Sequence, residues 1–183
     1  NEVLSLYQTP AVEVHDRHQK GLLSLLHEFD RVCRHLDIPY MLFSGTMLGA
    51  VRHGGFIPWD DDTDVLMPRP DYEKFLELYR KENPSKRFVL VDDNDPESFS
   101  GNIFAVLMDT DHTMVKEYQQ DMDMPHGIPL DIFPIDGCPE GKIQRYIQYM
   151  WTLIYSLFIS EFVPEKHGGL VAFASKVMLG MLP

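Results

Sequence analysis

Cysteine is scarce in this chain, and basic residues are outnumbered by acidic ones. Its two cysteines, Cys33 and Cys138, are too few for a disulfide framework or a thiolate metal site. Lysine and arginine together number 16 against 28 aspartates and glutamates, which gives a formal net charge of -12. That balance argues against nucleic acid as a partner, because such binding depends on basic contacts to phosphate. It is compatible with a small phosphorylated ligand whose charge is met by metal ions.

Apolar runs long enough to span a bilayer are also missing. The longest run, residues 150–162, is interrupted by Ser156, Ser160 and Glu161. We expect a core helix there, with a helix lying at the membrane interface as the alternative. The expected location is therefore cytoplasmic, with peripheral attachment to the inner face of the membrane as its variant. An apolar share of 44% over 183 residues suits a single domain over residues 1–183, and the uncapped last helix predicts a chain that continues further.

Helical and extended patterns alternate along the chain. Apolar residues at three- and four-residue spacing predict helices at 15–37, 46–52, 71–81, 141–162 and 170–181. Apolar, β-branched runs predict strands at 40–43, 63–67, 88–91, 102–108, 113–116 and 128–135, with a hairpin turn at 109–112. Pro129 and Pro134 predict that the last strand lies at an edge or carries a bulge. The interleaving predicts an α+β, or mixed α/β, fold.

A run of aspartates enters the strand predicted at 63–67. Alternate side chains of a strand share a face, so Asp62 and Asp64 point the same way, and Asp60 joins them if the strand starts early. Such oxygen ligands suit Mg²⁺ or Mn²⁺, which can clamp the oxygens of a phosphoryl transfer. A solvated acidic loop is the alternative. The apolar residues on both sides of the run argue against a solvated loop. Converging carboxylates also repel by about 3 kcal/mol per pair at about 5 Å, so they need a cation.

A calcium-binding loop is a more specific alternative interpretation of the same aspartate run. Asp60, Asp62 and Asp64 match the first three ligand positions of an EF-hand, and Asp71 matches the closing one. The glycine that the turn needs is replaced by Val65, and prolines follow. We therefore favour the strand interpretation.

A third carboxylate is expected from another strand. Asp131 is a lone charge within an apolar run, and such a position usually needs a partner. The alternative is a structural aspartate paired with an arginine or lysine, and Asp136 is the fallback ligand.

Residues that suit phosphate lie just before the aspartates. Ser44, Gly45 and Thr46 separate a predicted strand from a predicted helix. Gly45 permits close approach to backbone N–H groups, and a helix N-terminus attracts phosphate, although a plain turn or cap has the same composition. Arg52 is a candidate phosphate ligand and His53 a candidate substrate ligand. Their alternatives are a charge that complements the helix dipole and an ordinary surface histidine.

This region resembles the LicD family, which is similar to the fukutin-related proteins. The matching residues are Gly45-Thr46, 48–53, 55–62, Asp64, 67–69 and Asp71-Tyr72, followed by the aspartate motif at 130–134. The resemblance implies a nucleotidyltransferase-like fold, a mixed sheet flanked by helices. It implies transfer of phosphocholine, or a similar phospho-alcohol, from CDP-choline or a related donor to a cell-surface glycan.

A mechanism follows from the resemblance and the residues together. Asp62, Asp64 and Asp131 would hold Mg²⁺ or Mn²⁺, residues 44–46 would position phosphates, and Asp60 would accept a proton. Two alternatives remain open. One is a nucleotidyltransferase that moves a nucleoside monophosphate from a triphosphate, and the other is a non-catalytic nucleotide-binding module.

Overall fold

A computed structural model describes residues 17–82, 85–92, 104–114 and 125–159, which belong to two compact units. The described residues up to Asp136 form one unit, and those from Gly137 onward belong to the other. The elements of the first unit are α2 (Arg17–His35), β1 (Met41–Leu42), α3 (Ser44–His53), β2 (Asp64–Pro68), α4 (Arg69–Glu82), β3 (Phe88–Val91), β4 (Ala105–Asp109) and β5 (Ile128–Ile135). The second unit contains α5 (Lys142–Ile159).

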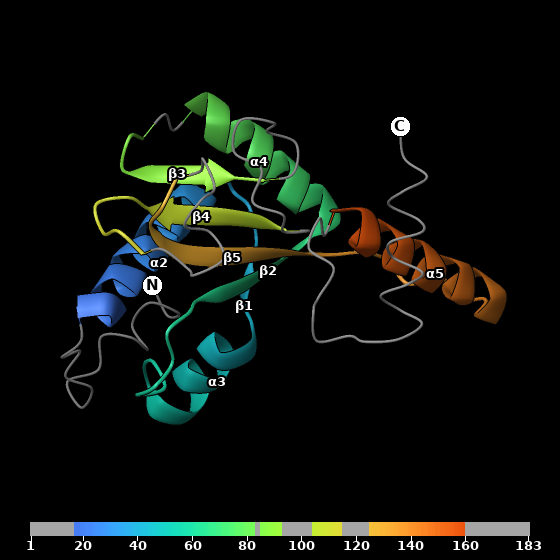
Figure 1. The fold of residues 1–183 in the computed structure, drawn as a ribbon, viewed down its shortest axis with the longest axis horizontal. Coiled ribbons are helices and arrows are strands. Elements are labelled where there is room, and N and C mark those ends of the chain that lie inside the picture. Colours follow the sequence, from blue (N-terminus) through green and yellow to red (C-terminus); the bar gives the residue numbers. More distant parts are fainter. Residues whose placement is uncertain (1–16, 83–84, 93–103, 115–124, 160–183) are drawn as a thin grey trace. The chain divides into compact units, whose positions relative to one another are not determined.

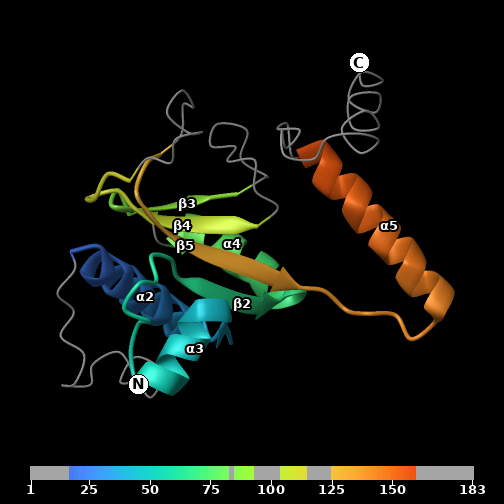
Figure 2. The ribbon, with the colours of Figure 1, turned by 60° about the horizontal axis from the view of Figure 1, so that its bottom comes forward.

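The first unit is built on a five-stranded sheet with the order β1-β2-β5-β4-β3 (Figures 1 and 2). Strands β2 and β5 run parallel, and every other neighbouring pair is antiparallel. Helices α2 and α4 contribute to the same apolar core as the sheet, and α3 packs beside β2. The expected mixed sheet flanked by helices is confirmed.

Strand alternation gives this sheet two different faces. The face that packs on α2 and α4, here called the core face, carries Val65, Met67, Leu107, Leu130 and Ile132, all fully buried. Helix α2 buries an apolar stripe against it, and α4 does the same: Leu22, Leu25, Leu26, Phe29, Val32 and Cys33 from α2, and Tyr72, Phe75, Leu76 and Tyr79 from α4. Each large apolar side chain buried in this way contributes about 1.5–3 kcal/mol.

The opposite face, here called the site face, carries the residues that alternate with those of the core face. They include Asp64 and Leu66 of β2, Asp131 and Phe133 of β5, and Val106 of β4. The two aspartates therefore lie on the face that the main core does not occupy.

Strand β5 is central, so the prediction of an edge strand from its two prolines was wrong. The N–H of Asp131 donates to a carbonyl on the β2 side at 2.9 Å, and strand N–H groups alternate between sides. The nitrogen of Pro129 therefore faces β2 and that of Pro134 faces β4. Strand β2 begins only at Asp64, opposite Asp131, so Pro129 has no β2 partner; β4 begins at Ala105, opposite Ile132, so Pro134 has no β4 partner. Neither needs to donate a hydrogen bond.

Two helix boundaries also differ from expectation. Helix α3 begins at Ser44, so Ser44 and Gly45 belong to its first turn instead of to a preceding turn. Helix α4 begins at Arg69 and includes Pro70, because proline is tolerated in a first turn, where its missing N–H would have no helical acceptor. The strand predicted at 113–116 is absent from residues 113–114, and its remainder and the helix predicted at 170–181 lie outside the described residues.

The second unit is described over residues 137–159. Many of the large apolar side chains of α5 are exposed: Ile143, Tyr146, Ile147, Tyr149, Met150, Trp151, Leu153 and Tyr155. None of the described helices combines the length and apolarity that crossing a membrane requires.

Candidate active site

Asp64 and Asp131 lie side by side on the site face. They are partners in the register of the parallel pair β2–β5, although 67 residues separate them in the chain. Neighbours in register on parallel strands project to the same face. The pairing predicted between these two carboxylate-bearing residues is thus present in the fold.

The start of α3 holds Asp64 through its backbone. The N–H of Phe43 donates to the Asp64 carbonyl at 3.0 Å, and the N–H of Asp64 donates to Thr46 Oγ1 at 2.9 Å. The Thr46 side chain is buried, so its hydroxyl serves Asp64 from inside the protein. The backbone C=O and N–H of Asp64 are therefore both hydrogen-bonded, to Phe43 just before Ser44 and to Thr46 just after Gly45.

Ser44 contacts the Asp64 carboxylate itself through a side-chain hydrogen bond. Its φ of 50° places it in the left-handed region, which is uncommon for a residue with a Cβ. Strain of this kind persists where surrounding contacts over-determine the conformation, and it clusters at functional sites. The hydrogen bonds on both sides of Ser44 supply that constraint here.

The carboxyl groups of Asp64 and Asp60 lie among like charges. Burial, followed by the nearby charges of Asp62 and Asp60, raises the pKa of Asp64 to about 6, while the Ser44 hydrogen bond opposes the rise. Burial and the charges of Asp62 and Asp61 also raise the pKa of Asp60. Such shifts are what carboxylates show when they share a site without a cation.

The acidic loop meets the start of α3 at Gly45. A Cβ added to Gly45 would lie 2.5 Å from Asp60 Oδ2, so the carboxylate occupies the space that a larger residue would need. Asp60 Oδ2 is buried, and no hydrogen-bond partner for it is present. The two segments singled out by sequence are therefore in direct contact, and the carboxylate covers the glycine on this side.

Helix α2 anchors the same loop from a distant part of the chain. His18 Nε2 lies 2.6 Å from the Asp61 carbonyl oxygen, and Gln19 Nε2 donates to the Ile57 carbonyl at 3.2 Å. Sequence reasoning missed both residues, because each is one polar position at the start of an otherwise amphipathic helix. Only their contacts with the loop identify them as supports of the site.

No three histidine, cysteine, aspartate or glutamate side chains within the described ranges converge closely enough to enclose a metal ion. The chemistry of the donors nevertheless fits a hard cation: Asp64 and Asp131 are neighbours, and Asp60 carries a buried oxygen without a partner. Asp62 is exposed in the loop, where its side chain is not held by core packing.

Two candidate ligands lie at the other end of α3. Arg52 is eight residues beyond Ser44, about 12 Å along the helix axis. Arg52 and His53 form the last turn, where a positive charge complements the helix dipole. Gly54 ends the helix in the left-handed conformation with φ 66°.

Asp136, the fallback ligand, is already paired. Its two carboxylate oxygens accept hydrogen bonds from Arg69 at 2.7 and 2.6 Å, and this pairing lowers its pKa. The structure therefore favours Asp131. It also removes the calcium-loop interpretation, because Asp64 begins a strand that pairs on both sides and Asp71 lies in the first turn of α4.

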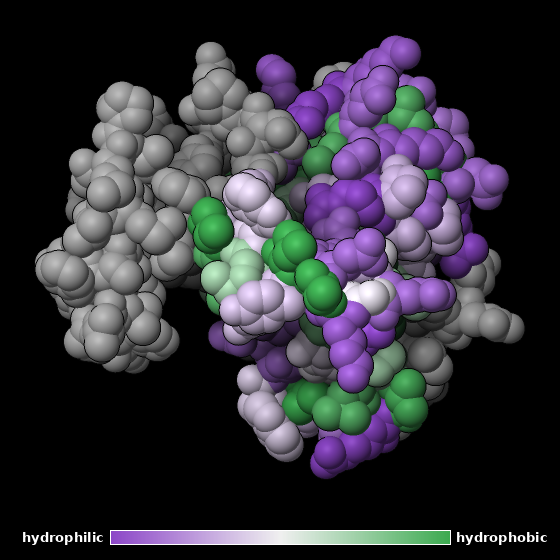
Figure 3. All heavy atoms as spheres, turned by 90° about the vertical axis from the view of Figure 1, so that its right-hand side faces the viewer, coloured by the Kyte–Doolittle hydropathy of each residue, from purple (hydrophilic) through white to green (hydrophobic). Residues whose placement is uncertain are grey.

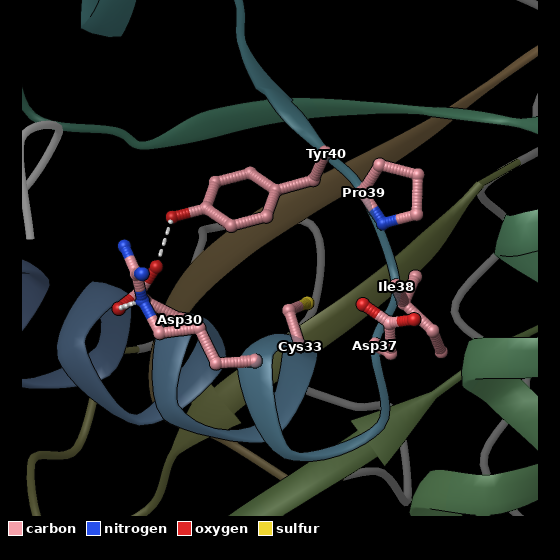
Figure 4. A pocket seen from close by; sticks show the side chains of 7 residues that line it. Asp30, Cys33, Asp37, Ile38, Pro39 and Tyr40 are labelled. Atoms are coloured by element: carbon pink, nitrogen blue, oxygen red, sulfur yellow. Dashed lines mark hydrogen bonds and ion pairs between the residues drawn. The ribbon is translucent and has the colours of Figure 1, made fainter.

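A hollow of about 490 Å³ lies at the end of α2, lined by Asp30, Cys33, Arg34, Asp37, Ile38, Pro39 and Tyr40 (Figure 4). The Asp30 carboxylate is satisfied there by Arg34 at 2.7 Å and Tyr40 at 2.9 Å. Burial raises the pKa of the Cys33 thiol, so this residue is a buried, unreactive cysteine. The hollow offers no group poised for chemistry.

The fold and site are a mixed sheet that carries paired aspartates beside the start of a helix, and comparison with known proteins gives the family. Residues 37–139 match the family described as LicD/FKTN/FKRP, nucleotidyltransferase domain, and the chain belongs to this family.

The relatives are longer proteins. The chain is 36% identical over 124 residues to the lipopolysaccharide cholinephosphotransferase LicD of Haemophilus influenzae, an alignment that covers 66% of this chain and 44% of that protein. It is 33% identical over 75 residues to an uncharacterized protein of Rickettsia typhi, covering 41% of this chain and 24% of that one. An uncharacterized protein of Rickettsia prowazekii is 37% identical over 68 residues, or 37% and 26% of the two chains. The chain thus spans less than half the length of these relatives.

Proposed function

We propose that this chain transfers phosphocholine, or a similar phospho-alcohol, from a CDP-activated donor to a hydroxyl of a cell-surface glycan. The observation that carries the proposal is the pairing of Asp64 with Asp131 beside the start of α3, within a domain of the LicD family. The relative in Haemophilus influenzae, a lipopolysaccharide cholinephosphotransferase by name, supports the choice of donor alcohol and acceptor.

In this proposal Asp62, Asp64 and Asp131 hold a Mg²⁺ or Mn²⁺ ion, which neutralises the diphosphate when bound. The raised pKa of Asp64 supports this role, because a cation would relieve the repulsion that causes part of the shift. The first turn of α3 binds the donor's phosphates through backbone N–H groups that have no acceptor within the helix.

The acceptor hydroxyl attacks the phosphorus that carries the alcohol. Its oxygen forms a bond to that phosphorus, the bond from phosphorus to the bridging oxygen breaks, and CMP leaves. The proton of the hydroxyl passes to a nearby carboxylate. Asp60 is the candidate, since burial and neighbouring charges raise its pKa and so increase its basicity.

The decisive experiment measures which product leaves. The protein is incubated with Mg²⁺ and either CDP-choline or CTP in the presence of a glycan acceptor. Release of CMP from CDP-choline with labelling of the glycan is the expected result. Pyrophosphate release from CTP would instead identify a nucleotidyltransferase. Binding of nucleotide without release of either product would identify a binding module.

A further inference from the structure

Three phenylalanines form a row on the site face, next to the paired aspartates. The ring centroids of Phe43 and Phe133 are 5.7 Å apart, and those of Phe104 and Phe133 are 4.3 Å apart. Phe133 follows Asp131 by two residues on β5, so their side chains share a face about 7 Å apart along the strand. Phe43 precedes α3 and donates its backbone N–H to Asp64. The row is therefore tied to both carboxylate strands.

The pair formed by Phe43 and Phe133 is open to solvent. Phe43 is 39% exposed and Phe133 is partly exposed, whereas the apolar side chains of the core face are buried. The two ring planes meet at 63°. A steep angle of this kind presents a ring face and a ring edge around a corner, which suits a compact group better than a flat nucleobase that stacks between parallel rings.

The charge beside this corner is negative. Asp131 precedes Phe133 by two residues on β5, and its register partner Asp64 on β2 accepts the backbone N–H of Phe43. Aromatic faces attract organic cations through the ring quadrupole, and carboxylates nearby add to the attraction. Rings and charge together complement a small organic cation.

We propose that Phe43 and Phe133 form the subsite for the quaternary ammonium group of the donor's alcohol. The proposal rests on the function proposed above, because it places the head group one strand step from the carboxylates that serve the diphosphate. No bond is made or broken at this subsite. Its contribution is to distinguish a donor with a cationic alcohol from one without it.

The test measures affinities of the full chain in Mg²⁺ for CDP-choline and CDP by calorimetry. Phe43→Leu keeps an apolar side chain against Phe133 but removes the ring, and Phe43→Tyr keeps the ring. Val51→Ala is the control. It removes an exposed apolar side chain from α3. Apolar surface, coloured green, gathers near the lower edge of Figure 3. Wild type should bind CDP-choline more tightly than CDP.

Phe43→Leu should weaken binding of CDP-choline by roughly two- to thirtyfold, the range of a cation–π contact, and leave CDP unchanged. Phe43→Tyr and Val51→Ala should retain the wild-type preference. Equal wild-type affinity for CDP-choline and CDP, or an equal loss for both ligands in Phe43→Leu, overturns the subsite while leaving a CDP donor in place. No wild-type binding of either ligand overturns the CDP donor itself.

Discussion

At the scale of single residues, Asp64 is where burial and charge conflict. Its side chain is only 8% exposed, its neighbours include two further aspartates, and a serine hydroxyl contributes the opposing hydrogen bond. A carboxylate in this position destabilises the folded protein when it is ionised without a cation. The conflict has a measurable sign.

Stability of the metal-free protein should fall as the pH rises through about 6. The pKa of Asp64 is raised from 3.8 to about 6, so the folded protein holds this proton more tightly than the unfolded chain. The associated stabilisation is complete below about pH 4 and is lost as the pH rises through about 6. Asp64→Asn should therefore be more stable than wild type at pH 7, by up to roughly 2–3 kcal/mol, in thermal melts without metal. A less stable mutant at pH 7 would mean that a fixed cation already balances Asp64.

Thr46 accepts the backbone hydrogen bond of Asp64, a structural role that its position beside Gly45 in the sequence does not indicate. Thr46→Val should leave the Asp64 N–H without its acceptor and cost about 1–3 kcal/mol in denaturant unfolding. Mg²⁺ affinity should fall as well, because Asp64 loses one of its two backbone anchors. Thr46→Ser keeps the hydroxyl and should stay close to wild type. Full metal affinity in Thr46→Val would show that the remaining contacts position Asp64 unaided.

At the scale of elements, α3 and the acidic loop behave as one assembly. The loop is held by His18 and Gln19 from α2, and the Asp60 carboxylate packs on Gly45 in the first turn of α3. A substitution in the first turn of α3 should therefore displace side chains of the acidic loop, and the reverse should also hold.

Gly45→Ala should displace the Asp60 carboxylate, because the new Cβ would lie 2.5 Å from its Oδ2. We expect weaker binding of CDP with metal binding largely retained, measured by calorimetry. Gly137→Ala is the matched control, since a Cβ there would meet nothing within 4 Å. Unchanged CDP affinity in a folded Gly45→Ala protein would leave Gly45 as a packing residue alone.

At the scale of the whole chain, metal binding should couple to folding. A ligand that binds only the folded state stabilises it by about 2.7 kcal/mol at a hundredfold excess over its dissociation constant. Mg²⁺ or Mn²⁺ should therefore raise the melting temperature.

Asp62→Asn and Asp131→Asn should each abolish most of this gain, and metal-free Asp131→Asn should melt at or above wild type. A loss of roughly 3–5 kcal/mol in that metal-free mutant would instead mark Asp131 as the partner of a buried cation. An unchanged response to metal in both mutants would place the metal site elsewhere.

Much of the fold could be read locally. The apolar stripes of α2 and α4 and the strands β2, β3 and β5 follow from periodicity over a few residues, and the structure confirms them within two residues at most boundaries. The aspartate run entering a strand predicted Asp62 and Asp64 as site residues, and a lone charge within an apolar strand predicted Asp131; the structure places Asp64 and Asp131 in register on neighbouring strands. These signals are local because burial of one face dictates the side-chain pattern of its own segment.

Other features exist only because distant segments meet. Pro129 and Pro134 predicted an edge strand, yet β5 is central. The two prolines are tolerated there because β2 does not extend opposite Pro129 and β4 does not extend opposite Pro134. The register of Asp64 with Asp131, the service of Thr46 to Asp64 and the support from His18 all join positions 18 to 67 residues apart. Sequence determined which side chains carry charge and which faces are apolar. Tertiary structure alone decided which of them share a site, because register and packing are set by the whole sheet.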